Sequence, residues 1–404
     1  MKIVSIHRRI PPSRTLPLAA WCSLVLSGLL FAQNDGLAPE VTDLNARDVS
    51  MKWEKTIPYL ASPYISTQPK DMHDGIPVGE LGADGGDKEA ILTFANEIAD
   101  EANTQRRDKT DSLLIFRRGK LVFESYYRRG RQNVPHFQMS ITKSYTALAL
   151  GRAIQLGHLA MDDLDKPVLD FLREFDRSEL AEGADRITLA DALTMRSGIR
   201  LIKEKVAGFK NKPELLKGQR QVQAYLEACE PIPPAPREFR YQAADPALIM
   251  QVLETVVPGS AEEFISKELM GKMGITEYAW QGDTSGLPKS AAGSSFRSRD
   301  MLKVGMLIRD GGKWKGERII PQAFIERAVS PITLGWGINF YGYSCWHRTL
   351  KHNDEAYPSI ELRGALGQFI FVFPKQDVIV VATAHGVMTM LREIPERIVP
   401  AFSK

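Results

Sequence analysis

The run Ser140-Ile141-Thr142-Lys143 places a hydroxyl and an amine three residues apart. On a helix, residues at positions i and i+3 share a face, so these two side chains can touch. A serine hydroxyl becomes a nucleophile when a base removes its proton, and a lysine can be that base when burial lowers its pKa. A helix start also presents free N–H groups that suit an oxyanion. The spacing alone equally describes a capping serine beside a surface lysine.

The elements that would position this pair follow from the spacing of apolar residues. Apolar and small residues continue to about Gly157, which predicts a buried helix over 140–157. Further helices are predicted at 87–103, 245–258, 298–311 and 388–402. Runs rich in β-branched and aromatic residues predict strands at 112–116, 120–127, 336–343, 368–373 and 378–383.

Strand patterns therefore lie near both ends of the chain, and helical patterns lie between them. We predict an α+β fold in which one antiparallel sheet, built from both ends, is flanked by terminal helices and carries an inserted, mostly α-helical region. The predicted parts are a signal peptide at 1–32, an extended lead-in at 33–86, a sheet domain at 87–157 and 331–404, and a helical domain at 158–330.

The first 32 residues have the layout of a secretory signal. They contain basic residues and no acidic one, followed by an apolar run at 19–30 and then Ala32. The run is shorter than the ~20 residues that span a bilayer. We expect cleavage after Ala32, export to the periplasm or the medium, and no stable membrane span afterwards. An uncleaved N-terminal anchor is the alternative.

The composition of the 404 residues, 44% hydrophobic and 25% charged, is typical of a soluble globular protein and excludes a disordered or multi-span membrane chain. Four of the 52 basic residues and none of the 49 acidic ones lie in the signal, so the rest is nearly neutral and gives no electrostatic reason to bind nucleic acid. Cys229 and Cys345 could form one disulfide or remain two buried thiols. No metal or cofactor motif is present in the sequence, so none is expected.

Four segments resemble, in the right order, the signatures of the serine β-lactamase and penicillin-binding-protein superfamily. They are His136–Ser144, Leu193-Thr194-Met195-Arg196-Ser197-Gly198, Phe239-Arg240-Tyr241 and Gly364-Ala365-Leu366-Gly367-Gln368. The resemblance spans about residue 110 to the C-terminus. It favours the branch with class C β-lactamases, family VIII carboxylesterases and 6-aminohexanoate-dimer hydrolases, and it implies the fold of that superfamily.

The resemblance also implies catalytic roles. Ser140 would attack a carbonyl carbon, Lys143 would take its proton, and Tyr241 would be a general acid/base whose ionised form is favoured by the nearby ammonium. The backbone N–H groups of Ser140 and Ala365 would form the oxyanion hole. Gly364 would allow the close approach of the chain that this hole requires.

Two further side chains are candidates for contact with substrate. Gln368 follows the third motif, and Trp336 begins an aromatic-rich run before it. That run could line an acyl-binding cleft or could equally be ordinary sheet packing.

Two motifs depart from the superfamily pattern. Tyr241-Gln242-Ala243 stands where Tyr-x-Asn is usual, and Leu362-Arg363-Gly364 stands where Lys-Thr-Gly is usual. Arg363 could replace the missing cation, although neighbouring strand residues point to opposite faces. These departures favour an esterase or amidase that acts on a small molecule through an acyl-enzyme. A β-lactamase or D-Ala-D-Ala carboxypeptidase is the alternative enzyme, and a non-catalytic or slowly deacylating binder of β-lactams or cell-wall peptides is the alternative of another class.

Overall fold

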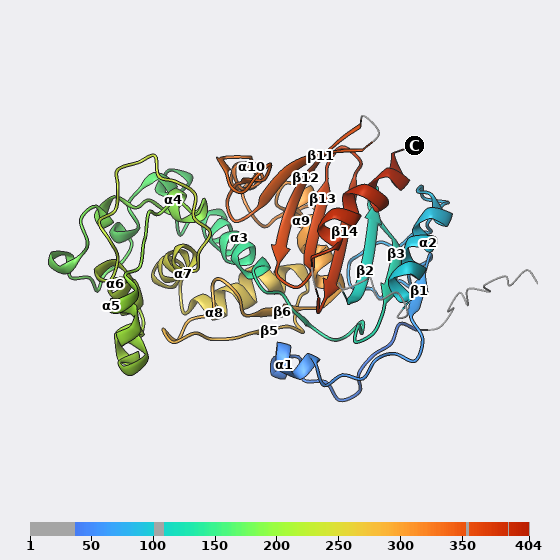
Figure 1. Ribbon diagram of the computed structural model, residues 1–404, viewed down its shortest axis with the longest axis horizontal. Coiled ribbons are helices and arrows are strands. Elements are labelled where there is room, and N and C mark those ends of the chain that lie inside the picture. Colours follow the sequence, from blue (N-terminus) through green and yellow to red (C-terminus); the bar gives the residue numbers. More distant parts are fainter. Residues whose placement is uncertain (1–36, 101–108, 353–354, 387, 404) are drawn as a thin grey trace, which may run out of the picture. The chain divides into compact units, whose positions relative to one another are not determined.

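The computed structural model describes residues 37–100, 109–352, 355–386 and 388–403, so the predicted signal peptide lies outside the described residues. The main element of the described chain is a nine-stranded sheet in which all neighbours are antiparallel (Figure 1). In spatial order its strands are β1 (Tyr64–Ser66), β3 (Lys120–Tyr126), β2 (Thr110–Arg117), β14 (Val378–Ala384), β13 (Gln368–Phe373), β12 (Glu355–Gly364), β11 (Trp346–His352), β10 (Phe340–Tyr341) and β9 (Thr333–Leu334). Because β2 pairs with β14, the prediction of one sheet built from both ends of the chain is confirmed.

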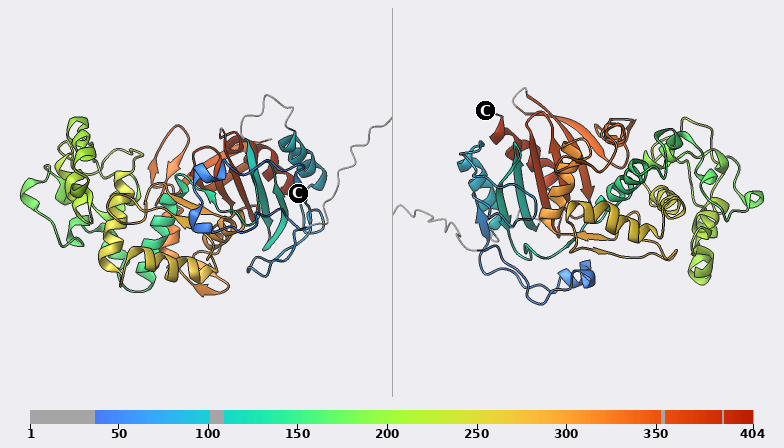
Figure 2. Two further views of the ribbon diagram at one scale, coloured as in Figure 1. Left: turned by 90° about the horizontal axis from the view of Figure 1, so that it is seen from below. Right: turned by 180° about the vertical axis from the view of Figure 1, so that it is seen from behind.

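The centre of the sheet is buried on both faces. β14 reads Val-Ile-Val-Val-Ala-Thr-Ala with every residue buried, as expected for a strand covered on two sides. Helix α2 (Lys88–Ala99) covers one face through Ile91, Phe94 and Ile98, which recur at helical spacing. The C-terminal helical segment, which begins with α11 (Met390–Glu393), packs on the same face (Figure 2).

The other face carries α9 (Ser298–Arg309), with α3 (Ile141–Gln155) beside it and α7 (Ala244–Val256) packed on α3. α9 approaches the sheet closely at Gly305, where a Cβ atom would lie 2.7 Å from the Cγ2 atom of Ile379. The predicted helix at 140–157 is confirmed as α3. From Ile141 to Ile154 all of its residues are buried, so it is a core helix that holds its first turn rigidly.

The remaining helices are short. They are α1 (Met51–Glu54), α4 (Leu189–Leu193), α5 (Lys203–Ala207), α6 (Arg220–Glu227), α8 (Ala261–Phe264) and α10 (Gln322–Ala328). Two small sheets accompany them, formed by β4 (His136–Phe137), β6 (Ser294–Phe296) and β5 (Ala279–Trp280), and by β7 (Lys313–Trp314) and β8 (Glu317–Arg318). None of the helices in the described ranges is long and apolar enough to cross a membrane. The division into a sheet domain and a helical domain stays a prediction.

Three local predictions need correction. Of the strand predicted at 336–343, only β10 is a strand, and the residues before it form the turn of a hairpin with β9, closed by a hydrogen bond from the Gly335 N–H to the Asn339 carbonyl at 2.8 Å. The lead-in contributes a helix and an edge strand to the fold, because α1 and β1 both lie within 33–86. Strands β11 and β12 were not predicted at all.

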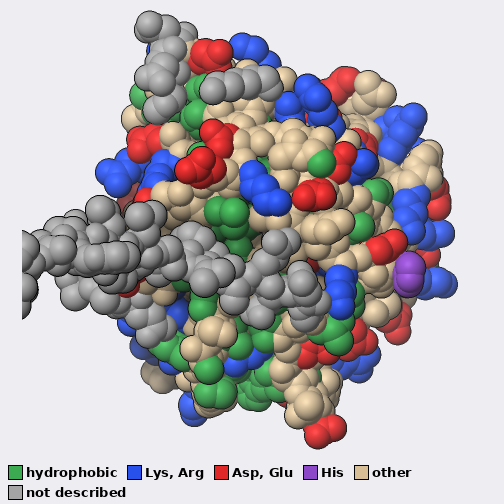
Figure 3. Space-filling view, turned by 90° about the vertical axis from the view of Figure 1, so that its right-hand side faces the viewer, with side chains coloured by type: hydrophobic (Ala, Val, Ile, Leu, Met, Phe, Trp, Pro, Cys, Tyr) green, Lys and Arg blue, Asp and Glu red, His purple; other side chains and the backbone are tan. Residues whose placement is uncertain are grey.

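The structure also bears on the two cysteines and on the surface charge. Cys229 and Cys345 are both buried and both free, so the two-thiol alternative holds. On the face drawn in Figure 3, basic and acidic side chains are interspersed and neither sign gathers into a patch.

Candidate active site

The Ser140 and Lys143 side chains meet at the first turn of α3. The Lys143 amine donates a hydrogen bond to the Ser140 Oγ atom at 3.0 Å and another to the Ala291 carbonyl at 2.9 Å. Ser140 occupies the N-cap position but makes no side-chain cap, so its hydroxyl is directed to the lysine. Met139, just before it, has a φ of 49°, a left-handed conformation that is costly for a residue with a side chain. Such strain is common where a reactive side chain must be presented at a fixed angle.

Burial governs the charge of Lys143. The residue is 5% exposed, and burial lowers the pKa of its amine from 10.5 to about 8. A substantial fraction of this amine is therefore neutral near physiological pH, which a proton acceptor for Ser140 requires.

Tyr241 lies directly beside the pair. The Lys143 amine sits 4.7 Å from the centre of the Tyr241 ring, over its face. Burial raises the pKa of the Tyr241 phenol, and a hydrogen bond with Ser140 and the positive charge of Arg363 oppose that rise only in part. The ionised phenol is therefore not favoured, contrary to the expectation from the sequence, because burial outweighs the hydrogen bond with Ser140 and the charge of Arg363. A protonated phenol is suited to donate a proton.

The end of β12 lies against the backbone just ahead of Ser140. A Cβ atom on Gly364 would lie 2.3 Å from the carbonyl oxygen of Gln138, so only glycine fits there. Ala365 follows directly and is exposed, and Leu366 then turns the chain with a φ of 67°. The structure thus brings Gly364 and Ala365 beside the segment that carries the nucleophile. The role of the Ala365 N–H as an oxyanion donor stays a prediction.

The structure places the two substrate-contact candidates differently. Trp336 is 57% exposed, and its ring centre lies 5.4 Å from that of Tyr241. The Gln368 amide is buried, and it bonds to the backbone of Ala384, donating to its carbonyl at 2.5 Å and accepting from its N–H at 3.4 Å. Trp336 therefore borders the site, whereas the structure does not bring the Gln368 amide to it.

The unusual second motif is part of a closed hydrogen-bonding network. The Gln242 amide donates to the Asp245 carboxylate at 2.5 Å and to the Ser197 hydroxyl at 3.3 Å. The Ser197 N–H in turn donates to Asp245 at 3.1 Å. Asp245 is fully buried, and burial raises its pKa from 3.8 to about 7. This network links two sequence motifs and fixes the backbone next to Tyr241.

The unusual third motif supplies no free cation. Leu362, at the usual lysine position, belongs to the hydrophobic core. The Arg363 guanidinium donates to Glu361 at 2.5 Å and to Asn339 at 2.8 Å, and it stacks over the Trp346 ring at 5.0 Å. Arg363 therefore lies near Tyr241 but is held by protein partners.

Sequence reasoning missed two kinds of group at this site. The Ala291 carbonyl, which holds the Lys143 amine, carries no side-chain signal. Tyr341 and Trp346 pack around Tyr241 with ring centres 6.1 and 5.6 Å away. The aromatic-rich run that contains them was recognisable, but its contact with Tyr241 depends on tertiary structure.

One family model matches most of the chain, and known proteins share its fold or part of its sequence. The model of the family described as Beta-lactamase matches residues 95–397, about three quarters of the chain. A 6-aminohexanoate-dimer hydrolase of Paenarthrobacter ureafaciens is 24% identical over 251 residues, and the match spans 59% of this chain and 61% of that relative's length. Among solved structures, a protein of Bacillus anthracis assigned as a 6-aminohexanoate-dimer hydrolase has a TM-score of 0.61 at 16% identity, covering 89% of this chain and 96% of that one. A class C β-lactamase variant has a TM-score of 0.57 at 17% identity, covering 76% and 94%.

Proposed function

The chain belongs to the Beta-lactamase family of serine hydrolases, and on that basis we propose that it cleaves a carboxylic ester or amide through an acyl-enzyme. The observation that carries the proposal is the 3.0 Å contact between the Lys143 amine and the Ser140 hydroxyl at a buried helix start. A hydroxyl that touches a partly neutral amine can transfer its proton as it attacks a carbonyl carbon.

In the proposed acylation step, Ser140 Oγ bonds to the carbonyl carbon while its proton moves to the Lys143 amine. The carbonyl oxygen becomes an oxyanion, which the N–H groups of Ser140 and Ala365 would stabilise. The protonated Tyr241 phenol then gives its proton to the departing alcohol or amine, and the lysine ammonium restores it. Water completes the cycle by attacking the acyl-enzyme carbonyl, with the same groups moving protons in reverse.

Three side chains favour an ester or linear amide over a β-lactam. Leu362 replaces the cation expected to meet a β-lactam carboxylate, and it is buried in the core. Arg363 is engaged by Glu361 and Asn339 and would have to give up these contacts to meet a carboxylate. The Gln242 amide is likewise held by Asp245, so it is not free to bind an acylamide side chain.

The hairpin beside Tyr241 favours a substrate with an apolar part. Leu334, Trp336, Ile338 and Phe340 are all at least 40% exposed, although their side chains are apolar. Exposed apolar groups that cluster next to a reactive centre commonly mark a binding surface. We propose that they contact the acyl or leaving group.

The test is a substrate panel assayed with wild type and Ser140→Ala. The panel contains a short-chain p-nitrophenyl ester, a 6-aminohexanoate dimer and a chromogenic cephalosporin, with intact mass recorded before and after. Turnover of the ester or dimer that is lost in Ser140→Ala supports the proposal. Cephalosporin turnover exceeding ester and dimer turnover contradicts it in favour of a β-lactamase. A stable adduct without turnover contradicts it in favour of a slowly deacylating binder.

Export is a separate proposal that rests on residues 1–32 alone. If these residues are a signal, protein recovered from outside the cytoplasm has an intact mass that corresponds to a start at Gln33. Recovery of the full-length mass from the membrane fraction would favour the anchor instead.

A further inference from the structure

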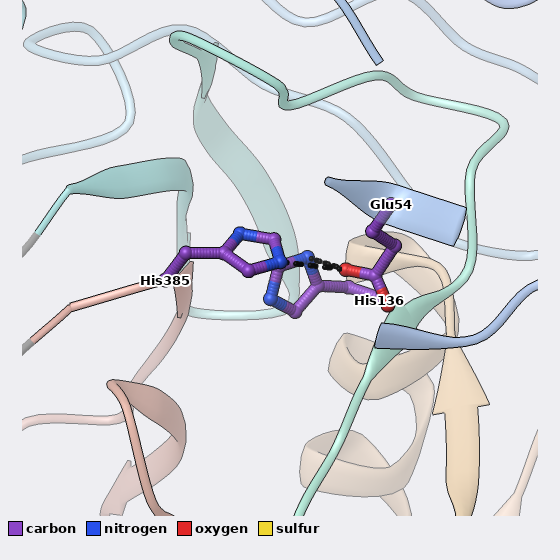
Figure 4. A group of neighbouring side chains, drawn as sticks. All are labelled: Glu54, His136 and His385. Atoms are coloured by element: carbon purple, nitrogen blue, oxygen red, sulfur yellow. Dashed lines mark ion pairs between the residues drawn. The ribbon is translucent and has the colours of Figure 1, made fainter. Parts of the chain in front are cut away.

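Three residues far apart in the sequence converge on one point close to the nucleophile segment. Glu54 ends α1, His136 lies in β4 four residues before Ser140, and His385 follows β14 (Figure 4). One oxygen of Glu54, Oε2, lies 2.9 Å from the His136 Nδ1 atom and 3.3 Å from the His385 Nε2 atom. All three side chains are at least nine-tenths buried.

The outer nitrogen of each imidazole is held by an acceptor. His136 Nε2 lies 3.2 Å from the Ala384 carbonyl oxygen, and His385 Nδ1 lies 2.6 Å from the Asp111 carboxylate. Both partners can only accept, so these two nitrogens carry the hydrogens. The other two nitrogens, His136 Nδ1 and His385 Nε2, both point at the same carboxylate oxygen and are ion-paired with it. They become metal ligands when a bound ion displaces their protons.

The inner atoms form ion pairs without well-oriented hydrogen bonds. Glu54 Oε2 and His385 Nε2 are buried and have no hydrogen bond of normal geometry within the described chain, although Oε2 is ion-paired with both imidazoles. A divalent ion could take the place of the imidazole protons and supply the positive charge that this buried carboxylate needs. The other Glu54 oxygen accepts the Phe137 N–H at 2.7 Å, so the carboxylate is held in place from the protein side.

The geometry points to a Zn²⁺ site formed by Glu54, His136 and His385. The three donor atoms lie within 4.8 Å of one another. Zinc–ligand bonds of about 2.0–2.2 Å in a tetrahedral arrangement separate ligand atoms by roughly 3.3–3.5 Å. Two imidazole nitrogens and one carboxylate are a common zinc donor set. An imidazole backed by a carboxylate, as His385 is by Asp111, is the usual support for such a ligand.

Charge and space are also compatible with a divalent ion. Glu54 and Asp111 supply two negative charges, so Zn²⁺ with two neutral imidazoles leaves the buried group neutral. A small cavity beside the three ligands has room for about one water, which could complete a fourth position. Arg129 and Arg131 also line this cavity. Arg129 lies over the Tyr59 ring at 4.7 Å, and Arg131 donates to the Pro58 carbonyl at 2.9 Å, so neither fills the site with its charge.

The ion would act as a positioning group for the active site. It would tie the lead-in to the segment that carries Ser140 and to the loop after β14. Gly386, next to His385, donates its N–H to the Leu366 carbonyl at 3.1 Å, and Leu366 adjoins Ala365. A bound ion would therefore brace both predicted halves of the oxyanion hole without touching the substrate.

The test measures zinc in tag-free protein after chelator treatment and dialysis against micromolar zinc. We expect one zinc per chain and a melting temperature that rises with zinc. Cobalt in its place should give the visible absorption of a tetrahedral site. Glu54→Gln keeps the bond from Phe137 but removes the charge, and it should weaken zinc binding at least tenfold. Asp111→Asn should weaken it by about 10- to 100-fold.

The matched control is His73→Ala, because that imidazole is 89% exposed. It should bind zinc as the wild type does. Folded wild-type protein that retains less than a tenth of an equivalent and shows no zinc-dependent melting shift would overturn the site. Wild-type affinity in Glu54→Gln would overturn the assignment of its ligands. Neither result bears on Ser140, so the hydrolase proposal is tested independently.

Discussion

The pH dependence of hydrolysis should report the buried amine of Lys143. Its pKa is lowered to about 8, so the neutral fraction is about one tenth at pH 7 and about nine tenths at pH 9. If neutral Lys143 accepts the Ser140 proton, kcat/KM should rise about tenfold between these pH values and then level off. An unshifted lysine with a pKa of 10.5 would instead give a rise of about 100-fold with no plateau.

The assay is kcat/KM for a p-nitrophenyl ester from pH 6 to 10, corrected for spontaneous hydrolysis. Lys143→Met removes the base with little change in volume, and it should lower kcat/KM by about 10²–10⁴-fold and abolish the inflection. The exposed Lys217 supplies the control, because Lys217→Met should keep the wild-type profile. The reasoning is refuted by a rate that still climbs tenfold per pH unit at pH 9, or by a Lys143→Met enzyme that retains more than a tenth of the activity.

Three further predictions concern the surroundings of the pair. Gly364→Ala should lower kcat about 10²–10³-fold, because the added Cβ atom would displace the end of β12 and with it the predicted oxyanion donor. Gly208→Ala is the control for protein quality, because open space surrounds that glycine. Trp336→Ala should raise KM for bulky acyl esters about 2- to 10-fold. The exposed Leu156, at the opposite end of α3 from Ser140, supplies the control, because Leu156→Ala should leave KM unchanged; equal effects of the two substitutions would contradict contact through Trp336. Asp245 has a native pKa of about 7 against 3.8, so its stabilising contribution is present at low pH and is lost as pH rises through 7. Urea unfolding at pH 5 and pH 8 should therefore show Asp245→Asn gaining stability relative to wild type by up to about 3 kcal/mol, and a pH-independent difference would contradict this.

Hydrophobic spacing correctly predicted the elements whose residues are nearly all buried. β14 and α3 are buried over nearly their whole length, so their sequences are unambiguous. β12 was missed because charged residues and Pro358 interrupt it, although its pairing with β11 and β13 tolerates them. The strand predicted at 336–343 is shortened to β10, because Trp336 and Ile338 are exposed on a turn in which Gly337 has a φ of 60°.

Short-range spacing found the Ser140–Lys143 contact because one helix turn enforces it. It could not find the group of Glu54, His136 and His385, whose members come from three separate segments and meet only in the folded chain. Gln368 shows the opposite failure. Its place beside the third motif suggested substrate contact, but its amide is used by the Ala384 backbone.

The pairing of β2 with β14 has a consequence for biosynthesis. β14 and the Ala365 end of β12 are translated more than 200 residues after Ser140, so roughly 10–50 s pass before they emerge at ordinary rates of synthesis. Until then the β2 edge is open and the nucleophile lacks its predicted second oxyanion donor. An unfinished chain would therefore be a poor hydrolase and would be prone to aggregate. The nascent β2–β3 hairpin needs shelter from other strands until β14 arrives.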